Sequence, residues 1–240
     1  MRPTDPLDTR SALGRNLTFG LTDVLGRMIV TGAYDDRPFP IEAELSKEHA
    51  VSRSVTREAV KMLAAKGLVT ARPRQGTIIT KPAAWNWFDT DVLRWLLERK
   101  FSLTLLRQFT ELRLSIEPGA AALAAQAASP EGVELIQRGY ARMEAAESGV
   151  DNALSSDIAF HVAILEASGN PFFAQFRDVV ATALQTSIQY TNRHRGRSAS
   201  LPAHKAVLDA IVARDSEGAA DAMRALLADV VSLTREAAEE

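Results

Sequence analysis

The stretch IEAELSKEHAVSRSVTREAVKMLAAKGLVTARPRQGTIIT, residues 41–80, decides the fold of the N-terminal part of the chain. Its first half predicts two short helices joined by a tight turn, and a glycine follows the second, where helices commonly end. Its second half has two runs rich in apolar and β-branched residues around a Pro-Arg-Gln tip, a pattern typical of a β-hairpin. The expected elements are helices at Glu42–His49 and Arg53–Lys66, a turn at Ala50–Ser52, and strands at Leu68–Arg72 and Gly76–Thr80.

A further helix is expected upstream, at Leu17–Gly32, where apolar residues recur at helical spacing. The turn after it contains Pro38 and Pro40, which end a helix. Three helices and a two-stranded hairpin make up a winged helix-turn-helix, so we expect this fold over residues 16–80. Residues 1–15 are polar and contain Pro, Asp and Thr, and we expect a disordered arm.

The rest of the chain predicts helices. All three tryptophans lie in residues 81–100, so we expect a linker whose aromatic side chains pack on a domain, with a helix at Asp91–Arg99. Beyond it, alanine-rich segments alternate with breaks at Pro, Gly and Ser. We expect helices over 103–128, 131–147, 152–168, 171–192, 202–213 and 216–236. The predicted fold is mainly α, with residues 101–240 forming an all-α antiparallel bundle.

Composition limits the class of protein. The chain has no cysteine, no apolar run long enough for a membrane span and no signal peptide, so we expect a cytoplasmic protein without thiolate metal sites. The net charge of −2 is divided unevenly, with +4 on residues 1–82 and −6 on residues 83–240. A basic segment on an acidic chain is typical of a nucleic-acid-binding domain joined to a domain with another role.

The helix expected at Arg53–Lys66 has the two faces that a DNA-reading helix needs. Its core side carries Thr56, Ala59, Val60 and Leu63. Its other side carries Ser52, Arg53, Ser54, Arg57 and Lys61, and the wing adds Arg72, Arg74 and Gln75. Arginine binds guanine in a bidentate manner, whereas lysine and serine suit phosphates. A basic helix face can also be a solvated surface, but its coincidence with a wing favours DNA binding.

The segment LSKEHAVSRSVTREAVKMLAAKGLVTARPRQG resembles the signature of the GntR family of transcription regulators, in which a Val-Ser-Arg turn leads into an Arg-Glu-Ala helix and a wing containing glycine. The resemblance implies contacts to operator DNA from Ser52, Arg53, Ser54 and Arg57, and from the wing at Arg74 to Gly76. The chain departs from the pattern at Thr56, where valine is common. It also departs at Ala43, where many members have a basic residue that touches DNA.

Four residues of the C-terminal part are candidates for ligand binding. Asp157 and His161 are spaced i, i+4, so both leave one helix face and can share a metal ion; the alternative is a hydrogen bond in the core. His204 lies on a core-facing stripe, where a histidine often has a structural role. Arg113 can bind a carboxylate in a bidentate manner; the alternative is a salt bridge to Glu117.

Three segments, ELRLSIEPGAAALAA, DIAFHVAILEASGNP and HKAVLDAI, resemble motifs of the FCD effector domain in the FadR-like branch of the same family. The resemblance covers residues 100–236 and implies a central cavity with Arg113, Asp157, His161 and His204. Many FCD domains bind a divalent metal, zinc or similar, through an Asp and three His, and the metal receives a carboxylate effector. Leu226 stands where the third His is found. We therefore expect an effector site that acts through hydrogen bonds and charge, with the metal weakly held or absent.

The linker segment WNWFDTDVLRWLL resembles one found in FCD regulators of sugar-acid catabolism of the galactonate type. This implies an aldonate or a related sugar acid as effector, with its carboxylate on Arg113. Its hydroxyl groups would bind Asp157, His161, His204 and either Asn170 or Gln185. Together the resemblances imply a homodimeric repressor that binds double-stranded operator DNA and releases it when the effector binds.

Two alternatives remain open from the sequence. A metal-dependent enzyme of small hydroxy acids with a DNA-binding head would use the same Asp157, His161 and His204, although neither H-E-x-x-H nor a nucleophile motif occurs. A structural DNA binder without an effector is disfavoured, because the polar groups on inward helix faces would then be buried without a ligand.

Overall fold

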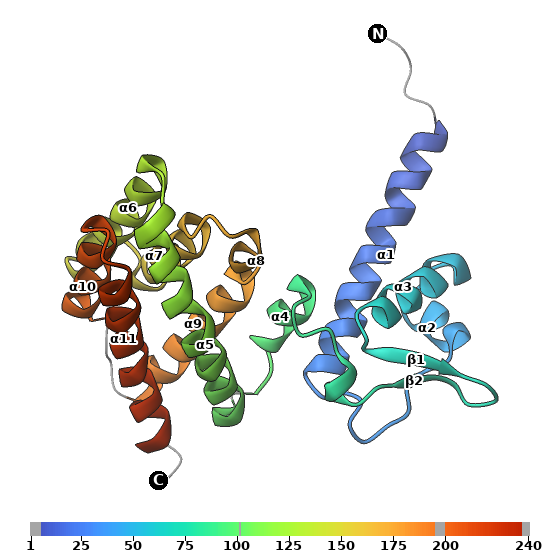
Figure 1. The fold of residues 1–240 in the computed structure, drawn as a ribbon. Helices are drawn as coiled ribbons and strands as arrows, with labels where there is room; N and C mark the ends of the chain where they lie inside the picture. The colour runs from blue at the N-terminus through green and yellow to red at the C-terminus, as the bar shows by residue number, and fades with distance from the viewer. Residues whose placement is uncertain (1–5, 101, 195–199, 237–240) are drawn as a thin grey trace. The chain divides into compact units, whose positions relative to one another are not determined.

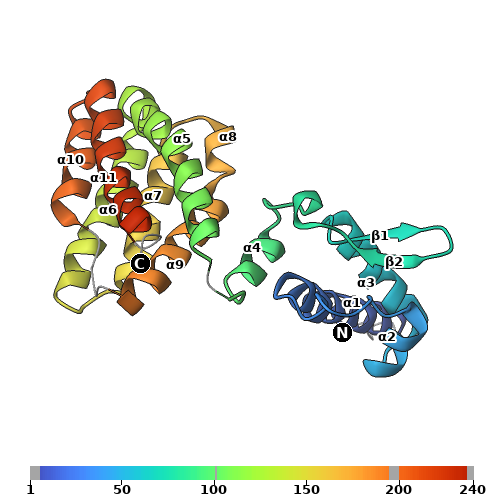
Figure 2. The same cartoon turned by 90° about the horizontal axis from the view of Figure 1, so that it is seen from below.

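The computed structural model describes residues 6–100, 102–194 and 200–236, with side chains over 16–100, 102–187 and 200–228. The chain divides into two compact units, Met1–Lys100 and Phe101–Glu240. Figure 1 shows that the first unit combines helices with a two-stranded sheet, and that the described part of the second unit is helical. Figure 2 shows the same division from below.

The first unit is a winged helix-turn-helix, which confirms the fold predicted from residues 41–80. It comprises α1 (Pro6–Val30), α2 (Glu42–Glu48), α3 (Arg53–Ala65), β1 (Val69–Arg72) and β2 (Gly76–Ile79). The two strands are antiparallel, with Val69 opposite Ile79 and Arg72 opposite Gly76. Helix α3 packs against both α1 and α2, and each of the three helices contributes a fully buried leucine: Leu25, Leu45 and Leu63. These leucines hold the three helices on one core.

Two local contacts fix the geometry around α3. Gly67, just after the helix, has a φ of 75°, and a Cβ there would lie 2.2 Å from the carbonyl oxygen of Ala84. Only glycine therefore fits at this position. At the other end of α3, the hydroxyl groups of Ser46 and Thr56 are 2.8 Å apart and join α2 to α3 by a hydrogen bond.

The linker residues pack within the first unit through a short 3-10 helix, η1 (Pro82–Ala84), and α4 (Thr90–Leu96). Trp95 of α4 is fully buried, and its indole N–H donates a 2.8 Å hydrogen bond to the Asp23 carboxylate on α1. Its ring lies against Gly26, where a Cβ would come within 2.2 Å of the ring atoms. Ion pairs surround the tryptophan, and we call their members the linker cluster: Asp23, Lys66, Asp89, Asp91 and Arg94.

The second unit is a helical bundle, as predicted. Its helices are α5 (Leu103–Ala127), α6 (Pro130–Glu147), α7 (Ala153–Ala167), α8 (Pro171–Ala174), α9 (Arg177–His194), α10 (Leu201–Val212) and α11 (Ser216–Glu236). Helix α5 packs along α11, α6 packs along α7, and α10 contacts both α11 and α6. The buried face of α5 includes Ala120, Ala121, Ala124 and Ala125. Because these side chains are small, α11 can approach α5 closely.

Side-chain caps explain where several bundle helices begin. The side chains of four residues accept a hydrogen bond from a backbone N–H of the following first turn: Ser102, Ser129, Asn152 and Asn170. Such caps satisfy N–H groups that have no partner within the helix. Helices α6 and α7 accordingly begin next to the breaks that the sequence indicates.

Two helix ends in the first unit differ from the prediction by three residues or more, whereas the others agree to within two. Helix α1 begins at Pro6 rather than Leu17, whereas residues 1–5 of the expected arm lie outside the described residues. Proline is favoured at the first position of a helix, and no further proline interrupts residues 7–30. Helix α4 ends at Leu96 rather than Arg99, because the next amides bond to carbonyl groups three residues back, as in the tighter last turn of many helices.

The helix expected over residues 171–192 is in fact two helices, α8 and α9. The break lies at Gln175 and Phe176, where the backbone N–H of Phe176 bonds back to the carbonyl oxygen of Phe173 at 3.0 Å. Both phenylalanines pack against the bundle core. The turn between α8 and α9 therefore allows two aromatic side chains to reach the same core.

Candidate functional site

Five ionisable side chains meet inside the second unit, and we call them the site cluster. Arg113 and Glu117 come from α5, Asp157 and His161 from α7, and His204 from α10. The i, i+4 spacing places the two members of each helical pair on one face. All five side chains are only 1–8 % exposed. The structure thus brings together the four residues predicted from the sequence and adds Glu117.

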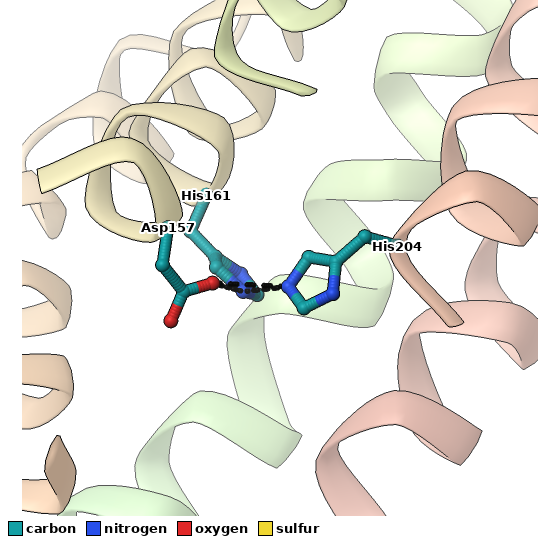
Figure 3. A group of neighbouring side chains, drawn as sticks. All are labelled: Asp157, His161 and His204. Atoms are coloured by element: carbon teal, nitrogen blue, oxygen red, sulfur yellow. Dashed lines mark hydrogen bonds and ion pairs between the residues drawn. The ribbon is translucent and has the colours of Figure 1, made fainter. Parts of the chain in front are cut away.

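Three members of the site cluster, Asp157, His161 and His204, form what we call the donor group (Figure 3). The Nε2 atom of His204 is 3.0 Å from Oδ1 of Asp157 and 3.3 Å from Nε2 of His161. The Nε2 atom of His161 is 3.5 Å from the same Oδ1. One atom from each side chain can serve as a metal ligand, and these atoms lie within 4.8 Å of one another.

The far nitrogens of both imidazole rings are bound to oxygen atoms. Nδ1 of His204 is 2.8 Å from the carbonyl oxygen of Ser200, and Nδ1 of His161 is 2.5 Å from Oε2 of Glu117. A carbonyl or an ionised carboxylate can only accept, so each Nδ1 carries the hydrogen. In the neutral rings the Nε2 lone pairs then face each other and the Asp157 carboxylate. Such a convergence of three electron-pair donors favours a cation between them, whether proton or metal.

Glu117 lies between Arg113 and His161 and remains ionised despite its burial. Its Oε1 accepts a 2.5 Å hydrogen bond from Nε of Arg113. Burial alone would raise the pKa of Glu117, but the charges of Arg113 and His161 and their hydrogen bonds lower it to about 2. For His161, burial and the Arg113 charge act to lower the pKa, but the nearby Glu117 charge and the hydrogen bonds that His161 donates to Asp157 and Glu117 outweigh them and raise the pKa.

Asp157 is also kept ionised. Burial would raise its pKa, yet hydrogen bonds with His161 and His204 and their charges hold the pKa well below its usual value. The site cluster therefore contains two buried carboxylates and one permanently charged guanidinium. The histidine pair can carry the balancing positive charge, as protons or through a bound cation.

The other predicted effector residues are not joined to the site cluster by any described contact. Asn170 caps α8, where its side-chain oxygen accepts a 2.9 Å hydrogen bond from the backbone N–H of Phe172. Gln185 is half-buried on α9. Leu226, at the position where the third histidine was considered, is buried on α11 among the apolar residues of the bundle core.

The predicted DNA-contacting residues all lie on the surface of the first unit. The buried side of α3 consists of Thr56, Ala59, Val60 and Leu63, as the helical spacing predicts. The exposed residues are Ser52, Arg53, Ser54, Arg57, Lys61, Arg72, Arg74, Gln75 and Gly76. Ser52 also has a structural role, because its hydroxyl oxygen caps α3 by accepting a hydrogen bond from the Val55 backbone N–H.

Two of the exposed basic residues have acidic neighbours. Nε of Arg57 lies 3.6 Å from Oε2 of Glu42 on α2, and Nζ of Lys61 lies 3.2 Å from Oε2 of Glu58. Such exposed pairs are weak, so a phosphate group can compete for either cation. Ala43, where a basic residue was considered, is exposed on α2.

Glu117 is the member of the site cluster that sequence reasoning did not place there. Its spacing from Arg113 indicates an i, i+4 ion pair, and the structure contains that pair. The sequence gives no sign of the second contact, to His161 on another helix.

Within the described residues, no helix has both the length and the apolar character required to cross a bilayer.

Comparison with known proteins agrees with this architecture. Residues 22–79 match the family described as bacterial regulatory proteins, gntR family, and residues 108–229 match the FCD domain. The solved structure of Lar from Listeria monocytogenes has a similar fold, with a TM-score of 0.58 at 17 % identity, covering 91 % of this chain and 96 % of that one.

Two relatives from Escherichia coli (strain K12) are similar over nearly the whole chain. The galactonate operon transcriptional repressor is 32 % identical over 218 residues, which are 89 % of this chain and 94 % of the relative. The uncharacterized HTH-type transcriptional regulator YieP is 32 % identical over 219 residues, which are 90 % of this chain and 94 % of the relative. The chain therefore belongs to the GntR family of DNA-binding transcription regulators and carries an FCD domain.

Proposed function

We propose that this regulator represses a sugar-acid catabolic operon and releases its operator when a carboxylate effector of the galactonate type binds the site cluster. The observation that carries the proposal is the contact between a buried guanidinium and the donor group. Nη2 of Arg113 lies 3.4 Å from both ring nitrogens of His161. An acid with a hydroxyl group next to its carboxylate can thus bind Arg113 through the carboxylate and the donor group through the hydroxyl group.

The donor group is suited to hold a divalent cation such as zinc through Asp157, His161 and His204. Leu226 led us to expect a weakly held or absent metal, but the convergence of the other three donors supports a cation held by these three alone. With three protein ligands, a bound cation supplies positive charge and open positions for oxygen atoms of an effector. The chain's own residues orient that effector: Arg113 binds its carboxylate, and burial excludes competing water.

The DNA side of the proposal rests on α3 and the wing. Arg53, Arg57 and Lys61 lie along its exposed side, and Arg74 lies at the hairpin tip. We propose that two copies of the chain bind a palindromic operator as a homodimer, since two-fold protein symmetry matches operator symmetry. Effector binding shifts the population towards dimers whose two DNA-binding units do not fit the operator.

Fluorescence anisotropy with DNA from upstream of the protein's own gene tests the effector. The zinc-loaded protein is titrated onto labelled DNA with and without galactonate, with galactitol as a matched control that has the hydroxyl groups but no carboxylate. Galactonate should weaken DNA binding and galactitol should not. If a panel of aldonates and aldarates leaves DNA binding unchanged, the effector assignment is wrong, although the DNA-binding assignment stands.

A variant of α3 tests the DNA-contacting residues. Arg57→Ala should abolish operator binding, because it removes a cation from the exposed side of α3. It should not unfold the protein, because Arg57 is exposed and its pairing with Glu42 is weak. Arg107→Ala is a matched control, since it also removes an exposed arginine but from α5 of the other unit. Retained operator affinity in Arg57→Ala would contradict the proposed role of α3.

The enzyme alternative receives no support from the relatives, which are described as transcription regulators. It would require turnover at the donor group. Incubation of zinc-loaded protein with the same sugar acids, followed by product analysis, separates an enzyme from a sensor.

A further inference from the structure

Glu117 contacts both Arg113, the predicted carboxylate clamp, and His161, a member of the donor group. Its side chain is 1 % exposed, and each of its carboxylate oxygens has a different principal partner. Oε1 accepts from Nε of Arg113 at 2.5 Å, and Oε2 accepts from Nδ1 of His161 at 2.5 Å. Nη2 of Arg113 also lies 3.5 Å from Oε2. One carboxylate thus holds the predicted effector clamp and one member of the donor group.

The contact to His161 determines how that ring faces the donor group. Because Glu117 accepts at Nδ1, the opposite nitrogen, Nε2, is turned towards Asp157 and His204. Without the carboxylate, Nδ1 would lose its acceptor, and the ring could place its hydrogen on Nε2 instead, where Asp157 can accept it. A histidine that presents a hydrogen to a cation cannot ligate it, so the tautomer decides whether the ring can act as a ligand.

The contact to Arg113 means that this guanidinium is not a vacant clamp. A resident carboxylate already holds its Nε edge, so an effector carboxylate must use the remaining N–H groups or displace Glu117. Either event changes the field and the position of the carboxylate that holds His161. A movement of Arg113, or a new charge beside it, therefore changes the environment of His161 in the donor group, because Glu117 contacts both residues.

We infer that Glu117 is a positioning residue that fixes the orientation of His161 and couples it to Arg113, so that a divalent cation and an effector carboxylate influence each other's binding. This inference rests on the proposed function, because it takes the donor group as the cation site and Arg113 as the carboxylate clamp. Binding linkage is reciprocal, so zinc and the acid must change each other's affinity by the same factor.

The first test compares zinc affinities by competition with a chromogenic chelator. Glu117→Gln keeps the size of the side chain and removes its charge. Glu111→Gln makes the same change at an exposed position of α5, where the glutamate pairs only with Arg107 among its described ion pairs. Loss of the carboxylate behind a ligating histidine should weaken zinc binding by about 10- to 100-fold. The Glu111→Gln variant should match the wild type, and equal affinities in all three proteins would overturn the inference.

The second test needs no variant, so it remains valid if Glu117→Gln does not fold. In wild-type protein with 15N-labelled histidine, NMR should show a hydrogen on Nδ1 of His161, shifted downfield by its short bond to a carboxylate. Adding zinc should retain that hydrogen while changing the Nε2 resonance. A hydrogen on Nε2 with none on Nδ1 would overturn the inference.

Coupling separates this inference from the proposed function. In the wild type, the zinc affinity is measured with and without galactonate, and the ratio of these two affinities should differ from one. In Glu117→Gln the ratio should return towards one. If wild-type protein binds neither zinc nor galactonate, the proposed function fails, while the NMR result still decides the role of Glu117. If both bind but the ratio is the same in wild type and variant, the coupling role is wrong.

Discussion

The linker cluster and the site cluster are charge networks of five residues each, and they differ in their access to water. The side chains of the linker cluster are 12–48 % exposed, whereas those of the site cluster are 1–8 % exposed. Both join helices that are distant in sequence. In the linker cluster, water screens the pairs of Arg94, which is 48 % exposed, and the fully buried ring of Trp95 packs against α1 at Gly26.

In the site cluster each charge depends on its neighbours, because little water reaches it. Glu117 and Asp157 are both held ionised by positive partners within hydrogen-bond distance. Removing a partner there leaves a charge buried and unpaired, whereas water can replace a lost partner of the more exposed members of the linker cluster, such as Asp23 and Arg94. The comparison indicates that loss of a charged partner costs little stability in the exposed network and much more in the buried one.

The largest expected effect is that of Arg113→Met, which removes the guanidinium and leaves Glu117 buried with His161. Loss of one partner of a buried pair costs about 3–5 kcal/mol. Hydrogen exchange followed by mass spectrometry should show faster exchange in α5 and α7 and unchanged exchange in α1 and α3. If the free energy of unfolding falls by no more than is usual for loss of an exposed ion pair, burial is not what distinguishes the two clusters.

Gly26→Ala tests whether packing rather than charge holds the linker. The added Cβ would lie within 2.2 Å of the Trp95 ring, and overpacking of this kind costs about 1–3 kcal/mol. All three tryptophans belong to the first unit, so tryptophan fluorescence during urea unfolding reports on that unit. Gly20→Ala is the matched control, because nothing lies within 4 Å of its Cβ and alanine favours the helix by up to about 1 kcal/mol. Equal midpoints for the two variants would contradict the packing role.

The sequence predicted the fold well because the signals are local. Helix α3 could be located from its spacing and its flanking turn, and Ser129 and Asn152 cap helices close to breaks that the sequence indicates. The ends that differ, at Pro6 and around Phe176, depend on how far a helix extends or bends to place side chains in a core. Local patterns do not carry that information.

The candidate site could be predicted only in part. Pairs on one helix, such as Asp157 with His161, follow from i, i+4 spacing, and the family resemblance grouped them with Arg113 and His204. The contact of Glu117 with His161 joins residues 44 positions apart, and that of Trp95 with Asp23 joins residues 72 apart. Such contacts depend on how helices pack, which the spacing along either helix does not reveal.

Arg94→Met provides the exposed counterpart of Arg113→Met. Arg94 pairs with Asp23 and Asp91 at 2.8 Å in each case, but its side chain is 48 % exposed. Pairs of this kind contribute about 0–1 kcal/mol, so the urea midpoint followed by tryptophan fluorescence should fall only slightly. A decrease as large as that caused by Gly26→Ala would mean that the ion pairs, and not the packing of Trp95, hold α4 in place.

The smallest expected effect is a change in pH dependence that arises from the linker cluster. Burial alone would raise the pKa of Asp23, but hydrogen bonds from Trp95 and Arg94 and the charges of Arg94 and Arg27 lower it. For Asp91, burial likewise acts to raise the pKa, and hydrogen bonds from Lys66 and Arg94 lower it overall. A carboxyl group with a lowered pKa stabilises the fold above its unfolded pKa, and this contribution is lost as the pH falls through the folded pKa.

Asp23→Asn should therefore lower the urea midpoint of the first unit at pH 7, as followed by tryptophan fluorescence. It should also lose less stability than the wild type when the pH falls below about 4, near the ordinary pKa of aspartate. The two midpoints should converge in acid, and added salt should reduce their difference at neutral pH because half-exposed charges are screened. If the urea midpoints of the two proteins change with pH in parallel, Asp23 contributes through its hydrogen bond to Trp95 and not through its charge. In that case the site cluster would be the only one of the two networks in which ionisation matters for stability.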